Sequence, residues 1–120
     1  MVKICVPTLG DRGLDEYVSE HFGRAPTFTI VDLKTNEVKV IPNTSQHMGG
    51  KGYPPEIMAQ LGVEVMICSG IGPRAISLFE NFGIEVYVGA HGTVRETIQA
   101  WQAGRLQMAT DENACKAHRH

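Results

Sequence analysis

An internal repeat in the second half of the chain constrains its fold more than any other feature. The segment LGVEVMI at residues 61–67 returns as FGIEVYV at residues 82–88. Each copy reads as a helix end, a glycine that stops the helix, a mostly apolar strand, and a glycine-containing loop that opens a new helix. Strands without an exposed polar face are typical of parallel sheets that are covered by helices on both sides. The repeat therefore predicts a parallel α/β sheet.

Three further strands are predicted in the first half of the chain. Residues 2–7 form an apolar run typical of a buried strand, and residues 27–33 and 37–41 read as a hairpin. We expect the first strand to be parallel to the strands of the repeat and the hairpin to lie at one edge. This predicts one three-layer α/β domain with a five-stranded mixed sheet over residues 1–106, followed by a polar, flexible tail at 107–120.

The predicted helices carry their own start and stop signals. A helix is expected over Pro54–Leu61, with Gly62 as its stop. Pro73 suits the first turn of the second helix, because proline lacks the N–H that is unpaired there. Residues 93–96, Thr-Val-Arg-Glu, have the pattern of a capping box for the third helix, which we expect to end at Gly104.

Composition excludes several classes of protein. The formal net charge of −2 does not indicate a general nucleic-acid binder, and no apolar run approaches the length of a membrane span. The chain begins with a strand-like pattern and not with a signal peptide. Its three cysteines are odd in number and widely spaced, which argues against a disulfide framework and for a reducing compartment. We therefore expect a cytoplasmic protein without a nucleic-acid or membrane partner, and its oligomeric state stays open.

Ligands of such sheets bind where the parallel strands end. The loops expected there, together with the loop at 43–53, combine glycines with His, Lys and Arg, and no acidic residue lies in 43–55 or 66–79. Because helix starts add partial positive charge, we expect an electropositive pocket on a slightly acidic protein. The candidate binding residues are His21, Arg24, His47, Gly49, Gly50, Lys51, Gly52, Gly70, Gly72, Arg74 and His91.

The sequence also contains six candidate metal ligands. They are His47, Cys68 and His21 in the loops, and Cys115, His118 and His120 near the end of the chain. Each has an ordinary explanation as well. His21 fits a solvated turn equally well, Cys68 at the end of a buried strand is commonly a small core residue, and the last residues also fit a polar tail.

Common catalytic motifs are absent from the sequence. Lys51 is followed by glycine where a phosphate-binding P-loop needs Ser or Thr, and Gly72 is followed by proline where the dinucleotide fingerprint continues differently. No Gly-x-Ser-x-Gly elbow is present, and the first strand lacks the carboxylates of a two-metal nuclease. We therefore expect that the protein is not an enzyme.

Four motifs together resemble one known family. They are SEHFGRA at residues 19–25, GGKG at 49–52, ICSGIGPRA at 67–75 and GAHGT at 89–93. In this order they resemble the dinitrogenase iron–molybdenum cofactor-binding family, over about residues 1–106. The resemblance implies a ribonuclease-H-like fold without ribonuclease chemistry. It also implies an anionic metal–sulfur cluster that is carried and not transformed, and one known member holds its cluster noncovalently.

Three hypotheses follow for function. The first is a carrier of an iron–sulfur or molybdenum–iron–sulfur cluster or its precursor, bound transiently and exchanged with donor and acceptor proteins. The second is a regulatory module that binds a small anion or a phosphorylated metabolite without metal. The third is an enzyme with Cys68 as nucleophile, for which no orienting third group is visible. The identity of the cluster and the involvement of a nitrogenase stay open.

Overall fold

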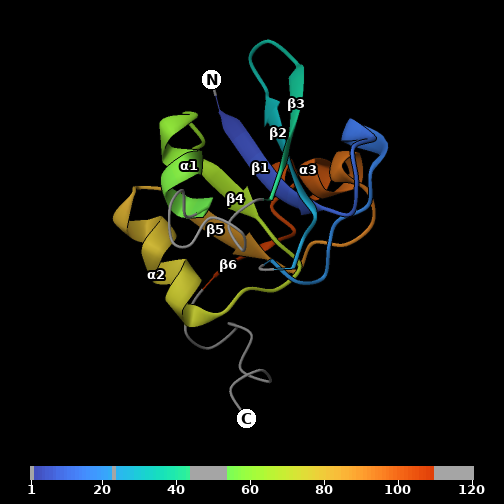
Figure 1. Cartoon of the computed structure of the whole chain (residues 1–120). Coiled ribbons are helices and arrows are strands. Elements are labelled where there is room, and N and C mark those ends of the chain that lie inside the picture. The colour runs from blue at the N-terminus through green and yellow to red at the C-terminus, as the bar shows by residue number, and fades with distance from the viewer. Residues whose placement is uncertain (1, 23, 44–53, 110–120) are drawn as a thin grey trace.

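The centre of the molecule is a mixed sheet of six strands (Figure 1). The computed structural model describes residues 2–22, 24–43 and 54–109. In chain order the strands are β1 (Lys3–Thr8), β2 (Thr27–Asp32), β3 (Glu37–Pro42), β4 (Val65–Ile67), β5 (Glu85–Val88) and β6 (Gln107–Met108). Their order in space is β3-β2-β1-β4-β5-β6. The α/β class predicted from the repeat is confirmed.

The directions of the strands follow the sequence pattern. β1, β4 and β5 are parallel to one another, as expected from their apolar character. β2 pairs antiparallel with β1, and β3 pairs antiparallel with β2, so the predicted hairpin forms one edge of the sheet. β6 pairs antiparallel with β5 at the opposite edge.

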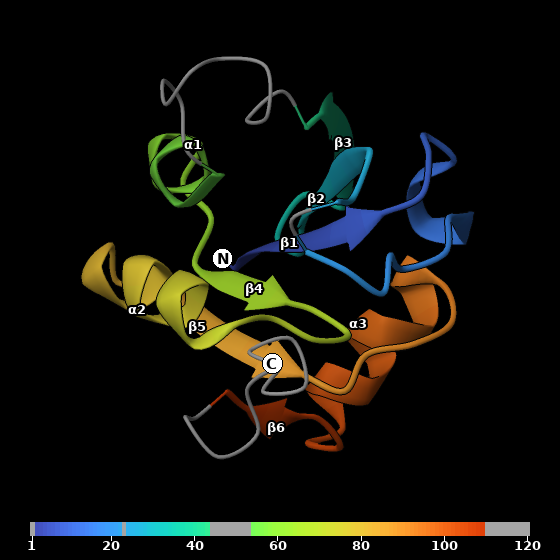
Figure 2. The same ribbon diagram turned by 60° about the horizontal axis from the view of Figure 1, so that its bottom comes forward.

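Helices cover both faces of the sheet and make three layers (Figures 1 and 2). α1 (Pro54–Gln60) and α2 (Pro73–Asn81) lie on one face, where Met58 and Phe79 pack in a core with Cys5 of β1. α3 (Val94–Gln102) lies on the other face, where Ile98 packs with Ile4 of β1. A short 3₁₀ helix, η1 (Gly13–Asp15), contacts α3 on that second face. Successive residues of β1 thus point to opposite cores, as the pleat of a strand requires.

Local signals predicted from the sequence are present in the structure. Gly62 and Gly83, which match each other in the repeat, have φ angles of 84° and 75°, a region that favours glycine. Pro73 begins α2, and Thr93 and Glu96 form the capping box of α3. α3 ends at Gln102, close to the expected stop.

The sequence analysis missed one strand. It predicted five strands and placed residues from 107 onward in the tail, whereas Gln107 and Met108 pair with β5. Both residues are exposed, so β6 shows no apolar alternation and depends on backbone pairing; Ala109 N–H, for example, donates to the Val86 carbonyl at 2.8 Å. Residues 110–120 lie outside the described residues. The ribonuclease-H-like assignment stays a prediction.

Within the described residues, no helix combines the length and the apolar character that crossing a membrane requires.

Candidate functional site

Three loops meet at the edge of the sheet where β1, β4 and β5 end, and we call this the carboxyl edge. The loop after β1 is bound to the loop after β5, because Val18 N–H donates to the Gly92 carbonyl at 2.9 Å. The loop after β4 is bound to the same loop, because Gly89 N–H donates to the Ser69 carbonyl at 3.1 Å. The loops after β1, β4 and β5 are therefore joined by backbone hydrogen bonds, whereas the further loop of the prediction, 43–53, lies outside the described residues after Asn43.

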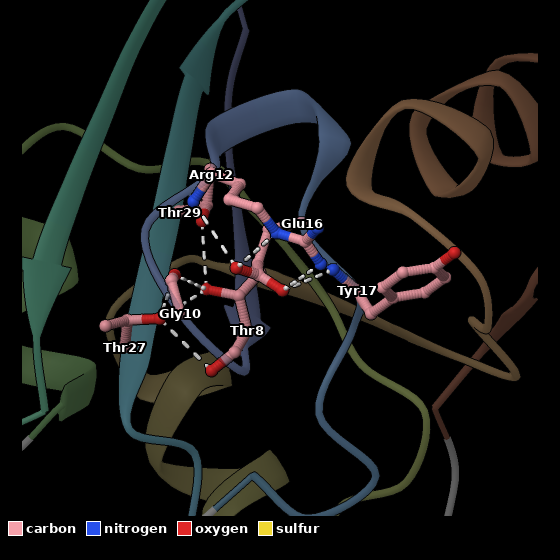
Figure 3. A network of polar contacts seen from close by, with 7 residues as sticks. All are labelled: Thr8, Gly10, Arg12, Glu16, Tyr17, Thr27 and Thr29. Atoms are coloured by element: carbon pink, nitrogen blue, oxygen red, sulfur yellow. Dashed lines mark hydrogen bonds and ion pairs between the residues drawn. The ribbon is translucent and has the colours of Figure 1, made fainter.

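A buried carboxylate shapes the loop after β1 (Figure 3). Glu16 is 5% exposed and accepts hydrogen bonds from the Tyr17 N–H at 2.9 Å and from the Arg12 guanidinium at 3.3 Å. These two donors, the Arg12 side chain first, lower the pKa of Glu16 below its usual value. The carboxylate is therefore ionised at neutral pH, and its hydrogen bonds fix the loop between Arg12 and Tyr17.

Three threonine hydroxyls hold the base of the same loop (Figure 3). Thr8 Oγ1 lies 2.9 Å from Thr29 Oγ1 and 2.7 Å from Thr27 Oγ1, and the Thr27 hydroxyl donates to the Gly10 carbonyl at 2.6 Å. Each hydroxyl has one proton, so the donors line up from Thr29 through Thr8 and Thr27 to the loop backbone. This chain of hydrogen bonds ties the loop to β2.

The turn with His21 and Arg24 is anchored by an aromatic side chain between them. The ring centroid of Phe22 lies 5.6 Å from that of Phe28 in β2 and 5.4 Å from that of Phe79 in α2. These packed rings place the turn beside α2, while His21 and Arg24 themselves are exposed. The sequence analysis identified the two polar residues and missed the phenylalanine that positions them.

The start of α2 is open to a ligand. Its N-cap residue, Gly72, has no side chain to accept a hydrogen bond, and a Cβ built there would meet nothing within 4 Å. The N–H groups of Arg74 and Ala75 belong to the first turn, where a helix has no partner for them. Arg74 is exposed and forms no ion pair with any described residue. The helix dipole, the free N–H groups and the guanidinium together favour an anion.

The start of α3 is closed by contrast. Thr93 Oγ1 accepts the Glu96 N–H at 3.2 Å, and Glu96 Oε1 accepts the Thr93 N–H at 2.9 Å. Arg95, which matches Arg74 in the repeat, lies 3.4 Å from Asp15. His91 precedes this helix and lines a pocket with α3 residues. Two helix starts that look alike in the sequence therefore differ in what they offer a ligand.

Cys68 lies in the core behind the edge. It is fully buried, and burial raises the pKa of its thiol well above the usual range. Cys5 is also fully buried, and the pKa of its thiol is raised by burial and by interaction with Cys68. A metal ligand or a nucleophile needs the thiolate, so this placement argues against Cys68 in either role.

Several candidate residues lie outside the described residues. In the loop before α1 these are His47, Gly49, Gly50, Lys51 and Gly52, and near the end of the chain they are Cys115, His118 and His120. The chain leaves the described part at Asn43, which is held at the carboxyl edge, since its backbone N–H donates to the Pro26 carbonyl at 3.0 Å and its Nδ2 to the Ala25 carbonyl at 2.8 Å. Gly70 is described and lies between β4 and α2.

The described edge offers single cationic residues and no compact metal site. No group of three or more His, Cys, Asp or Glu side chains that could hold a metal ion is found in the described part of the chain. Asp15 and Glu16 of the first loop are engaged with Arg95 and Arg12. Arginine side chains and the open start of α2 are the groups that the edge offers to an anion.

Comparisons with known proteins identify the family of this chain. The model of the family "dinitrogenase iron-molybdenum cofactor" matches residues 2–104. An uncharacterized protein of Methanocaldococcus jannaschii is 34% identical over 112 residues, which cover 89% of this chain and 91% of that protein.

Solved structures give the same result. The apo form of the orange protein from Desulfovibrio gigas matches with a TM-score of 0.81 and 30% identity, over 92% of this chain and 94% of that one. A Thermotoga protein described as a candidate NifB protein matches with a TM-score of 0.76 and 34% identity, over 90% and 93% of the two chains. Together with the family match, these likenesses show that this chain belongs to the dinitrogenase iron–molybdenum cofactor family.

Proposed function

We propose that this protein binds and carries an anionic metal–sulfur cluster, of the iron–sulfur or molybdenum–iron–sulfur type, or a precursor of one. The cluster is cargo that the protein holds and passes on without changing it. The observation that carries the proposal is the open start of α2, with Arg74 at its first turn and the His21–Arg24 turn packed beside the helix. Membership of a cofactor-binding family supplies the class of cargo.

The groups at this edge suit a polyanion with sulfide at its surface. N–H donors at a helix start and guanidinium groups form hydrogen bonds to anionic acceptors and balance their charge. A helix start contributes about 0.3–2 kcal/mol toward an anion, so several such contacts are needed for binding. Contacts of this strength also permit release, which a carrier requires.

His21 adds an imidazole for a metal or for a hydrogen bond to sulfide. His47 and Lys51 lie outside the described residues and remain candidates for the same cargo. Cys68 is not part of the proposal, because its thiol is buried. Partner proteins that donate or accept the cluster would approach this edge.

Anaerobic loading tests the proposal. The purified chain is incubated with tetrathiomolybdate, and separately with ferrous iron and sulfide, then desalted and measured for metal content and visible absorption. We expect retained metal in the unaltered protein and clearly less in Arg74→Gln and Arg24→Gln. Lys34→Gln, which removes one charge in the turn at the opposite end of β2, is the matched control and should retain as much metal as the unaltered chain.

The contrary results are distinct. A chain that stays metal-free with both mixtures contradicts the proposal. Equal losses of metal in Arg74→Gln and Lys34→Gln would show attraction to overall charge and no defined site. If metal is never retained but inorganic phosphate shifts the amide signals of Arg74 and Ala75, the chain is an anion-binding module without metal.

A further inference from the structure

A pocket lies on the α3 side of the sheet, and none of the residues of the proposed cargo site lines it. It has a volume of about 380 Å³, within the size range of small-molecule sites. Three segments form its walls: the loop after β5 with Gly89 and His91, α3 with Gln99 and Ala100, and the turn before β6 with Arg105 and Leu106. We propose that this pocket binds a small organic anion that carries a carboxylate or phosphate group.

The position of Arg105 is fixed by the way in which α3 ends. The Arg105 N–H donates to the Ala100 carbonyl at 2.9 Å, and the Gly104 N–H donates to the Trp101 carbonyl at 3.0 Å, with Gly104 at a φ of 73°. These bonds form a Schellman motif. Leu106, the next residue, packs against the core on the α3 face of the sheet. The backbone is therefore held on both sides of Arg105. The guanidinium is presented at the pocket by a rigid turn.

Arg105 is available to a ligand. Its side chain is exposed and makes no ion pair with any described residue. The one carboxylate in the pocket wall, Glu96, already accepts hydrogen bonds from the Thr93 N–H at 2.9 Å and from the Thr93 hydroxyl at 3.3 Å. These hydrogen bonds hold the Glu96 carboxylate at the start of α3, and it forms no ion pair with Arg105. Arg105 lines the pocket, and a guanidinium without an ion-pair partner is a recognition group for carboxylate or phosphate.

His91 is a second polar residue that lines the pocket. Its Nδ1 lies 3.3 Å from the Gly89 carbonyl, and its own carbonyl accepts the Thr97 hydroxyl at 3.4 Å. Both contacts orient the residue, and Nε2 is the ring nitrogen left for a ligand. Gln99 also lines the pocket and adds an amide. Arg105, His91 and Gln99 thus give the pocket three polar side chains that can bind an organic anion.

The test uses the metal-free protein and is therefore independent of the proposed cargo. ¹⁵N-labelled protein is titrated with succinate and, separately, with inorganic phosphate, while amide shifts are followed. We expect saturable shifts at Gly89, His91, Gln99 and Arg105 with at least one of the two probes. The probe that binds more tightly distinguishes a carboxylate ligand from a phosphate ligand.

Two pairs of variants separate charge from shape. Arg105→Gln removes the guanidinium and should weaken binding about tenfold or more, whereas Arg95→Gln removes an equal charge from α3, outside the pocket, and should not. Ala100→Leu fills the pocket without changing charge and should abolish binding, whereas Ala103→Leu makes the same change at an exposed position outside the pocket and should leave binding unchanged. The altered side chains are not in the core, so folding should be preserved.

Either of two results would overturn the proposal. One is the absence of saturable shifts at the four amides up to about 50 mM of each probe, a concentration that reveals even millimolar affinity. The other is an equal loss of binding in Arg95→Gln and Arg105→Gln, which would assign the shifts to general charge. Neither result would bear on the proposal that the protein carries a metal–sulfur cluster, because that proposal is tested by metal retention.

Discussion

At the scale of single residues, Glu16 shows how one buried charge organises the candidate site. It is 5% exposed and keeps its charge through Arg12 and the backbone of Tyr17. Arg12 itself is largely exposed, so solvent screens part of the attraction. The Tyr17 N–H is a second donor, from the backbone, to the same carboxylate, and the two hydrogen bonds together fix its place in the loop.

Glu16→Gln should lower the free energy of unfolding by about 1–2 kcal/mol at neutral pH, because the charge-assisted hydrogen bond from Arg12 is lost. The folded-state pKa of Glu16 lies below its usual value of 4.5. Its contribution is thus present above about pH 4.5 and is lost as pH falls through the lower, folded-state pKa. Denaturant melts from neutral to acidic pH should show the two proteins converging toward low pH.

The control for Glu16 is Glu20→Gln, which removes an exposed carboxylate from the same loop and should change stability by less than about 0.5 kcal/mol. A constant difference between Glu16→Gln and the unaltered chain at every pH would contradict the role given to its charge.

Cys5 and Cys68 should be inert toward thiol reagents in the folded protein. Both are fully buried, and burial keeps their thiols protonated at a pH where an exposed cysteine reacts. In a Cys115→Ala background, an aromatic disulfide reagent at mildly alkaline pH should label neither thiol until denaturant is added, and then both. Rapid labelling of the native chain would return Cys68 to the list of candidate ligands.

At the scale of elements, the two helix starts after β4 and β5 differ in their caps. The sequence shows a Gly-Pro start for α2 and a capping box for α3, and both predictions are confirmed. Glu96 folds over Gly92, whose φ of 86° and missing Cβ make room for the carboxylate. A closed start stabilises its own helix, whereas an open start leaves N–H donors for a ligand.

Substitutions at Gly72 should separate capping from charge. Its φ of −76° is ordinary and its Cβ position is free, so both Ser and Asp fit. Either residue should raise the stability by a few tenths of a kcal/mol, because both are better N-caps than glycine. Gly72→Asp should also reduce retained molybdenum more strongly than Gly72→Ser, because it puts a negative charge at the proposed site. Thermal unfolding and metal analysis check the two effects, and equal metal retention would contradict an anion site at α2.

At the scale of the whole molecule, the candidate site depends on contacts between segments that are far apart in the chain. The loop after β1 reaches α3 through the hydrogen bond from Val94 N–H to the Glu16 carbonyl, at 2.9 Å, and reaches α2 through the rings of Phe22 and Phe79. The carboxyl edge therefore forms only when the sheet has folded and brought these loops and helices together (Figure 2).

Phe22→Ala should release the His21–Arg24 turn from α2. Phe22 is half-buried, so we expect a loss of about 2–3 kcal/mol, below the range for a fully buried phenylalanine. Metal retention should also fall, because the turn that carries His21 and Arg24 is no longer held beside α2, although no charged group is removed. Phe22→Leu keeps much of the packing and should recover both properties; a Phe22→Ala protein that loads normally would show that this turn takes no part in the site.

The sequence by itself determined the parallel centre of the sheet and the ends of its helices. The repeat at 61–67 and 82–88 predicted β4 and β5, and the matching glycines at 62 and 83 adopt the same left-handed backbone. Such features are local: an apolar run, a proline, a capping pair or a glycine acts through its nearest neighbours in the chain. The candidate binding residues His21, Arg24 and Arg74 could also be identified from the sequence, because topology decides which loops lie at the ends of the strands.

Only the tertiary structure decided which of these signals could serve a ligand. β6 has no pattern of its own and exists because β5 offers an unpaired edge. The sequence left the role of Cys68 open, and its burial decided against a metal ligand. Phe22, Glu16 and Arg105 entered the argument only through residues of other segments that contact them or line the same pocket. Packing, burial and charge pairing depend on distances between residues remote in sequence, and a linear pattern does not contain those distances.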